Sequence, residues 1–134
     1  MDANVKSLID SYPNLARDYL TQIRALIYDI ALSESLGAIT ETLKWGEPSY
    51  ASKKGSPIRM DWKAKNPESV SLFFNCKTTL VETFRELHAD ALQLNGNREI
   101  IISLAEPLPV HELRSCLAMA MRFHDLKKLP LLGA

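Results

Sequence analysis

LQLNGNREIII, residues 92–102, has the pattern of a β-hairpin. Leu92 and Leu94 alternate with polar residues as far as Asn95-Gly96, the dipeptide best suited to the positive φ angles of a tight hairpin turn. The β-branched run from Ile100 to Ile102 follows as a return strand. The run therefore predicts two antiparallel strands joined by a turn in which Gly96 has a positive φ.

Two long amphipathic patterns predict helices. Pro13 favours a helix start, because a proline at the first helical position lacks only an N–H that would be unpaired there. Apolar residues then recur at three- and four-residue steps until about Ser33, at Leu15, Tyr19, Ile23, Leu26, Ile27 and Ile30. A second stripe runs from Val110 to Leu126, with Leu113, Leu117, Met119, Met121 and Phe123. Wide stripes of this kind are typical of helices that lie flat on a sheet.

The middle of the chain changes to a β pattern. Residues 58–62 alternate as a half-buried strand does, and residues 70–74 form a short aromatic and apolar run. Helical periodicity returns between Thr78 and His88. Because the connections are of hairpin length, we predict an α+β fold, with an antiparallel sheet of about five strands packed against two long helices on one face. Residues 1–134 are expected to form a single domain.

The overall composition excludes several classes of partner from the prediction. Sixteen basic residues balance sixteen acidic ones, which gives no support for a nucleic-acid partner. No apolar run approaches the ~20 residues that span a bilayer, and the N-terminus lacks the pattern of a signal peptide. Cys76 and Cys116 show no CxxC or metal-site spacing and are expected to be buried free thiols. These features predict a soluble cytoplasmic protein with neither a nucleic-acid nor a membrane partner.

The common catalytic and cofactor motifs are missing. The five glycines form neither a dinucleotide-binding nor a P-loop pattern, and no G-x-S-x-G occurs. The histidines at 88, 111 and 124 do not have metal-ligand spacing. Glu82 and Glu86 lie one helical turn apart and are interpreted as a solvated face. No cofactor and no metal site is predicted.

The segment ETLKWGEPSY, residues 41–50, concentrates chemically useful side chains. Its proline excludes a helix, so we expect it to bend from a short connection into the first strand. In one interpretation Trp45 and Tyr50 line an open cleft, where Glu41 and Lys44 orient a polar ligand. In the other, the two aromatic residues fill the edge of the core, and Glu41 and Lys44 form an ordinary ion pair.

The same segment resembles the E-x-x-K-W-G-x-P-x-Y motif of the YdhG-like family of domains of unknown function. The resemblance covers most of the chain from about Pro13 to the final helix, because the first long helix, the 70–74 strand and the strand start at 98–100 follow in the family's order. It implies a compact arrangement similar to frataxin, and some relatives are described as intracellular iron chaperones. Frataxin-like iron binding is associated with a dense acidic ridge, whereas the acids around this first helix are scattered, at Asp10, Asp18, Asp29 and Glu34.

The leading functional hypothesis is a binding module that uses the concave side of the sheet for a small polar ligand or a partner peptide. Its expected site residues are Glu41, Lys44, Trp45, Tyr50 and Arg98. The alternative is a frataxin-like iron chaperone. An enzyme with Glu41 as general base ranks third, because no second catalytic group stands out. The sequence specifies neither the ligand nor the oligomeric state.

Overall fold

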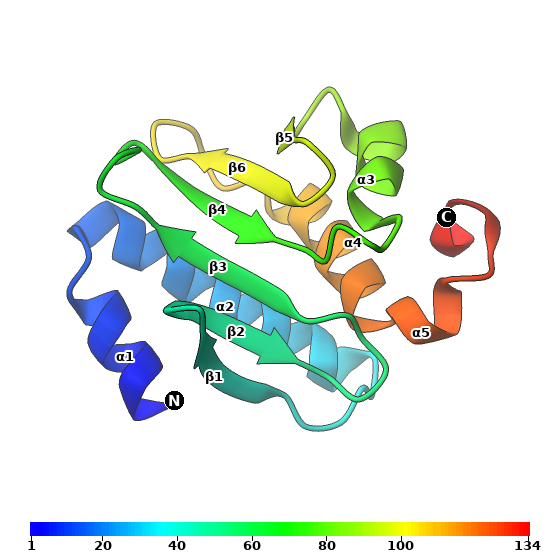
Figure 1. The fold of residues 1–134 in the computed structure, drawn as a ribbon, viewed down its shortest axis with the longest axis horizontal. Coiled ribbons are helices and arrows are strands. Elements are labelled where there is room, and N and C mark those ends of the chain that lie inside the picture. The colour runs from blue at the N-terminus through cyan, green and yellow to red at the C-terminus, as the bar shows by residue number, and fades with distance from the viewer.

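The computed structural model describes all 134 residues, and Figure 1 shows the arrangement of its elements. The helices are α1 (Ala3–Asp10), α2 (Asn14–Ser33), α3 (Leu80–His88), α4 (Val110–Met121), α5 (Phe123–Leu126) and the 3₁₀ helix η1 (Pro130–Gly133). The strands are β1 (Thr40–Lys44), β2 (Glu47–Ala51), β3 (Ile58–Trp62), β4 (Ser69–Phe73), β5 (Gln93–Asn95) and β6 (Glu99–Ser103).

The six strands form one sheet in the order β1-β2-β3-β4-β6-β5, and every neighbouring pair is antiparallel. The α+β class and the antiparallel sheet are confirmed, with six strands where about five were expected. Helices α2 and α4 both lie behind the sheet in the view of Figure 1, so they cover the same face. The opposite face carries no helix.

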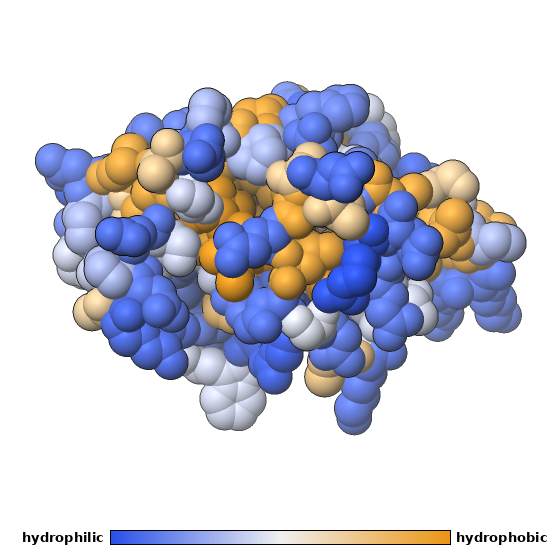
Figure 2. Space-filling model, turned by 90° about the horizontal axis from the view of Figure 1, so that it is seen from above, coloured by the Kyte–Doolittle hydropathy of each residue, from blue (hydrophilic) through white to orange (hydrophobic).

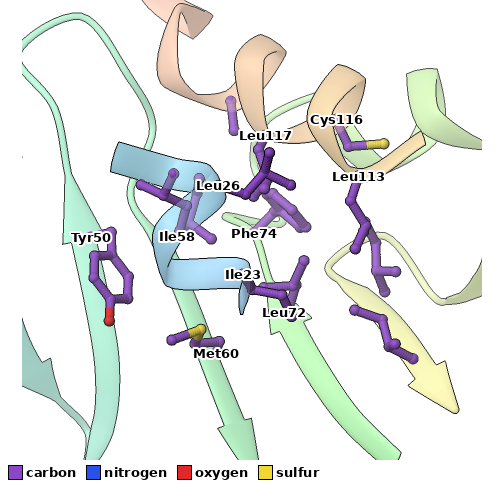
Figure 3. Packing of buried hydrophobic residues seen from close by; sticks show 14 of the residues in the cluster. Ile23, Leu26, Tyr50, Ile58, Met60, Leu72, Phe74, Leu113, Cys116 and Leu117 are labelled. Atoms are coloured by element: carbon purple, nitrogen blue, oxygen red, sulfur yellow. The ribbon is translucent and has the colours of Figure 1, made fainter. Parts of the chain in front are cut away.

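The core lies between the sheet and these two helices. Alternation directs every second strand residue inward, as the fully buried Ile58 and Met60 of β3 illustrate. They meet apolar residues of α2 and α4 such as Ile23 and Leu117 (Figure 3). Each such buried aliphatic side chain stabilises the fold by about 1.5–3 kcal/mol. This burial explains why the stripe periodicities predicted the two helices correctly.

The final helix ends earlier than its apolar stripe predicted. Helix α4 stops at Met121, and the short α5 follows after Arg122. The loop between β2 and β3 binds the carbonyls at this end: the Ser56 N–H donates to Ala120 O (2.8 Å) and the Ser52 hydroxyl to Met121 O (3.1 Å). Gly55 permits this approach, because a Cβ there would lie 2.8 Å from the Met121 backbone. The loop thus replaces the next turn of helix.

Helix α1 was not predicted. Asp2 caps it by accepting a hydrogen bond from the Val5 N–H (2.9 Å), and Val5 and Ile9 are buried. Two buried positions in eight residues give too short a pattern for periodicity to identify. Tertiary packing stabilises this helix, since it lies against β1. No helix in the molecule combines the length and apolarity needed to cross a membrane.

Candidate functional site

Residues 41–50 form a complete β-hairpin. Strands β1 and β2 pair from Thr40↔Ala51 to Lys44↔Glu47, which leaves Trp45 and Gly46 as a two-residue turn. Both turn residues have positive φ, 55° and 75°, as a type I′ turn requires. The expectation of a connection that bends into the first strand is therefore wrong, because the segment supplies the first two strands of the sheet.

Pro48 is compatible with β2 because of its place in the ladder. Its cross-strand partner is Leu43, one pair beyond the turn-flanking Lys44↔Glu47 pair, so its missing N–H would point away from β1. On the other side, the ladder between β2 and β3 includes only Ser49 and Tyr50 of β2. Proline is tolerated where a strand has no partner for that N–H.

Trp45 occupies a strained and solvent-exposed position. A non-glycine residue in the left-handed region costs about 1–2 kcal/mol, and turns of this type favour Asn or Asp at the first position. The tryptophan is 89% exposed, so burial of the indole does not offset this cost. An outlier of this kind motivates a functional hypothesis for the side chain.

Glu41 lies on the opposite, core-facing side of the hairpin. Arg24 donates to its carboxylate from Nε (2.6 Å) and Nη2 (3.2 Å), and the Asp2 backbone N–H donates a third hydrogen bond (2.8 Å). The side chain is only 5% exposed. Burial raises the pKa of Glu41, but the hydrogen bonds from Arg24 and Asp2 outweigh it and hold the pKa below its ordinary value.

Tyr50 pairs with Glu41 across the hairpin and is buried with it. The rings of Tyr28 and Tyr50 pack at nearly right angles with 6.3 Å between their centroids, and the Arg24 guanidinium lies 4.5 Å from the centre of the Tyr28 ring. The buried Tyr50 hydroxyl lies near the carboxylate but makes no hydrogen bond of good geometry. Burial first, and then the Glu41 charge, raise the pKa of Tyr50.

The five expected site residues therefore do not share one cleft. Glu41 and Tyr50 anchor the hairpin to α2, and the expected pairing of Glu41 with Lys44 is replaced by Arg24. A carboxylate with a lowered pKa and a bound guanidinium is also a poor general base. Lys44, Trp45 and Arg98 lie elsewhere, on the uncovered side of the sheet.

One cavity of about 240 Å³ brings those three residues together. We call it the Trp45 cavity, and define it by Lys44, Trp45, Arg59, Phe73, Asn75 and Arg98. Lys44 and Trp45 come from the β1–β2 hairpin, whereas Arg98 comes from the loop between β5 and β6. Strands β3 and β4 contribute Arg59 and Phe73, whose side chains contact each other: the Arg59 guanidinium lies 5.9 Å from the ring centre.

The electrostatics of the Trp45 cavity are one-sided. Three cations line it, and none of its lining residues is acidic. Arg59 Nη1 lies 3.4 Å from Glu47, whereas neither Lys44 nor Arg98 forms a salt bridge. The cavity therefore carries a local excess of positive charge in a chain with a formal net charge of zero.

Two further hollows continue across the uncovered face. One of about 280 Å³ shares Phe73 with the Trp45 cavity, and one of about 500 Å³ lies between β4 and β6. Ser71 and Glu99 line both, and the Ser71 hydroxyl donates to Glu99 (2.6 Å). These hollows are polar and contain both signs of charge, which distinguishes them from the Trp45 cavity.

The edge of the sheet at β5 and β6 has a different character. Viewed from that side, apolar residues show between hydrophilic ones in Figure 2. The hollow there measures about 180 Å³ and is lined in part by Leu92, Ile101 and Pro107. It contains no basic residue, so it lacks the charge pattern of the Trp45 cavity.

Arg59 and Phe73 line the Trp45 cavity and were not predicted from the sequence, although a usable signal for Arg59 existed. In the predicted 58–62 strand, Ile58 and Met60 face inward, so alternation places Arg59 and Asp61 on the other face.

Beside the cavity, Lys63 Nζ bridges Glu47 and Asp61, at 3.0 Å from each.

The two cysteines differ in environment. Cys116 is buried, and burial raises the pKa of its thiol to about 12. Cys76 is exposed and also lines the Trp45 cavity, so the expectation that both thiols are buried is wrong for this residue. The short loop after β4 keeps Cys76 at the surface.

The acids considered for iron lie in separate interactions. Asp10 pairs with Lys6, Asp29 with Arg114, and Glu34 with Arg122, while Asp18 accepts a hydrogen bond from Gln22. No three His, Cys, Asp or Glu side chains form a group that could hold a metal ion.

The segment that resembles the YdhG-like motif thus forms the β1–β2 hairpin. No family model matches the chain, and no similar curated protein or solved structure was found. The YdhG-like and frataxin-like relationships stay predictions.

Proposed function

We propose that this protein is a cytosolic binding module of the YdhG-like type, which holds a small polar ligand on the uncovered face of its sheet. The Trp45 cavity is the binding site. The observation that carries the proposal is the convergence of Lys44, Trp45 and Arg98, from two separate hairpins, on one cavity. Binding pockets typically combine apolar walls with a few convergent polar groups, and this cavity offers both.

The size of the cavity favours a small molecule over a partner peptide. Pockets for small molecules typically measure about 300–1,000 Å³, and the Trp45 cavity lies just below that range at about 240 Å³. A peptide would have to extend into the mixed-charge hollows lined by Ser71 and Glu99. Variants in those hollows therefore distinguish the two kinds of partner.

A thermal-shift screen of polar metabolites tests the proposal. Lys44→Gln and Arg98→Gln should leave the Tm of the free protein within about 1 °C, because both side chains are exposed and unpaired. Each should remove most of the stabilisation that a bound metabolite gives the wild type. The matched control is Lys128→Gln, which makes the same charge change at an exposed position outside the cavity. A screen without any stabilising compound, or one whose hits bind both cavity variants normally, would contradict the proposal.

The iron-chaperone alternative has no comparable support, because the candidate acids are dispersed among separate partners. Anaerobic titration with Fe(II) by calorimetry tests it. Saturable binding that Asp18→Asn or Asp29→Asn removes would favour the chaperone over the binding module.

A further inference from the structure

We propose, building on the proposed function, that the ligand of the Trp45 cavity is a small planar anion: one aromatic or heteroaromatic ring that carries a carboxylate or phosphate group. Charge, ring-stacking surface and size each restrict the ligand independently.

Charge selects an anion. Lys44, Arg59 and Arg98 line the cavity without a lining carboxylate, so a cationic ligand would meet only like charges there. The planar fork of arginine matches the two oxygens of a carboxylate or phosphate, and hydrogen bonds of this charged type are the strong ones. Arg98 is free to form them, since it has no salt-bridge partner of its own.

The aromatic side chains select a flat ligand. Trp45 presents an indole that is 89% exposed, and Phe73 lines the same cavity beneath Arg59. Flat rings stack on such surfaces in offset or edge-to-face arrangements, whereas a saturated ring gains only its apolar contact. A ligand that stacks on Trp45 also supplies the contact that the exposed indole lacks in the free protein.

The remaining lining groups add hydrogen bonding at defined positions. The Asn75 side-chain oxygen already accepts a hydrogen bond from the Lys77 N–H (2.9 Å), so its amide N–H groups are the ones left to donate to a ligand. A donor at this position again favours an acceptor such as an anionic oxygen.

The charges of the surroundings favour the Trp45 cavity over the adjoining hollow for an anion. The adjoining hollow of about 280 Å³ is lined by Lys63 and Lys65 but also by Asp61 and Glu99, so it offers an anion no comparable excess of positive charge. With a volume of about 240 Å³, the cavity accommodates a single ring with its acid group.

Four matched probes test this inference on the full chain. Benzoate and phenyl phosphate carry the proposed chemistry, benzamide is the uncharged counterpart of benzoate, and cyclohexanecarboxylate is its non-planar counterpart. Binding is measured by amide and indole NMR shifts during titration at 150 mM salt, with the Trp45 indole N–H as the reporter inside the site. We expect benzoate or phenyl phosphate to shift this signal saturably, and benzamide and cyclohexanecarboxylate to bind at least about tenfold more weakly. The better of the two anions identifies the acid group.

Variants locate the binding. Arg98→Gln should weaken the preferred anion at least about tenfold, while Lys128→Gln leaves it unchanged. If benzamide binds as tightly as benzoate, the ligand does not need a negative charge and the inference fails. If cyclohexanecarboxylate binds as tightly as benzoate, the ligand does not need a planar ring and the inference fails as well. Equal shifts with inorganic phosphate also overturn the inference, since they reduce the effect to charge attraction alone.

The metabolite screen separates failure of this inference from failure of the proposed function. If none of the probes binds but a neutral metabolite stabilises the protein and depends on Lys44 or Arg98, the inference fails and the binding module stands. If neither probes nor metabolites bind, both fail.

Discussion

Two hairpins of the sheet, β1–β2 and β5–β6, differ in the residues that form their turns. Asn95 is the last residue of β5 and pairs with Glu99, so residues 96–98 form a three-residue loop; Gly96 has the predicted positive φ, 59°, but Asn95 does not. In the β1–β2 hairpin a tryptophan precedes the glycine and itself adopts a positive φ. In the β5–β6 loop only a glycine adopts positive φ, as backbone preferences favour, whereas in the β1–β2 turn the tryptophan does so against them. The unfavourable positive φ of Trp45 occurs in the hairpin whose turn residue is proposed to bind the ligand.

The hairpins also differ in how they are attached. Strand β6 is held by buried apolar residues such as Ile100 and Ile102. The β1–β2 hairpin is held in addition by Glu41, whose carboxylate binds Arg24 of α2 and the backbone ahead of α1. Its exposed turn can therefore tolerate an unfavourable residue, because the other end of the hairpin is firmly anchored.

The largest expected effect is the loss of this anchor. Glu41→Gln should lower the free energy of unfolding by about 2–3 kcal/mol at pH 7, because Arg24 loses a largely buried charged partner. Denaturant unfolding measures the change, with the exposed Glu82→Gln as the control. Equal stability of Glu41→Gln and the wild type at pH 7 would show that the hairpin needs no ionic anchor.

The same pair of proteins predicts a pH dependence. The pKa of Glu41 is lower in the folded than in the unfolded state, so its contribution to stability is complete above the unfolded value of about 4.3. The contribution is lost as the pH falls through the lower, folded pKa. The difference between wild type and Glu41→Gln should therefore shrink at about pH 3. A difference that stays constant between pH 7 and pH 3 would contradict this origin.

The two turn glycines should have effects of similar, intermediate size. Gly46→Val and Gly96→Val should each cost about 1–2 kcal/mol, because a β-branched residue resists positive φ. Neither substitution meets a steric obstacle, since no atom lies within 4 Å of either added Cβ. Thermal unfolding measures the cost, and Asn97→Val, in the same loop at an ordinary φ, is the control. An unchanged Tm in either glycine variant would contradict the prediction that the glycine of that turn stabilises the fold by adopting a positive φ.

The sequence predicted those parts of the fold that depend on local chemistry. Pro13 marked a helix start, and Asn95-Gly96 marked a hairpin, because each residue type acts on its own backbone. The end of α4 at Met121 could not be predicted, since a loop distant in sequence binds its last carbonyls. The β1–β2 hairpin was missed because a tryptophan at positive φ has no local signal.

Because the β1–β2 hairpin was not predicted, the expected site residues were placed together although they lie on opposite faces of the sheet. Side chains of a strand alternate between faces, so Glu41 and Lys44, three residues apart, must point to opposite sides once residues 40–44 are a strand. Interpreted as an irregular bend, the same residues were expected to converge. Lys44, Trp45 and Arg98 were predicted from residue type and line one cavity, while the contact of Arg59 with Phe73 depends on the pairing of β3 with β4.

The smallest expected effect on stability is the most informative about Trp45. Trp45→Asn should raise the free energy of unfolding by about 0.5–1 kcal/mol, because asparagine tolerates positive φ and precedes glycine in the favoured type I′ pair. The lost indole contributes little to packing at 89% exposure. The same variant should lose binding of the preferred ligand in the screen.

Trp62→Phe provides the contrast for this test. Trp62 is half-buried, packs on Tyr12 at 5.3 Å between ring centres, and donates its indole N–H to Pro67 O (3.0 Å). Its replacement should therefore destabilise the fold and leave ligand binding intact. If instead Trp45→Asn destabilises the protein as Trp62→Phe does, the Trp45 indole supports the fold in spite of its exposure. A gain in stability together with a loss of binding would show that this turn sacrifices stability for the contact it makes with a ligand.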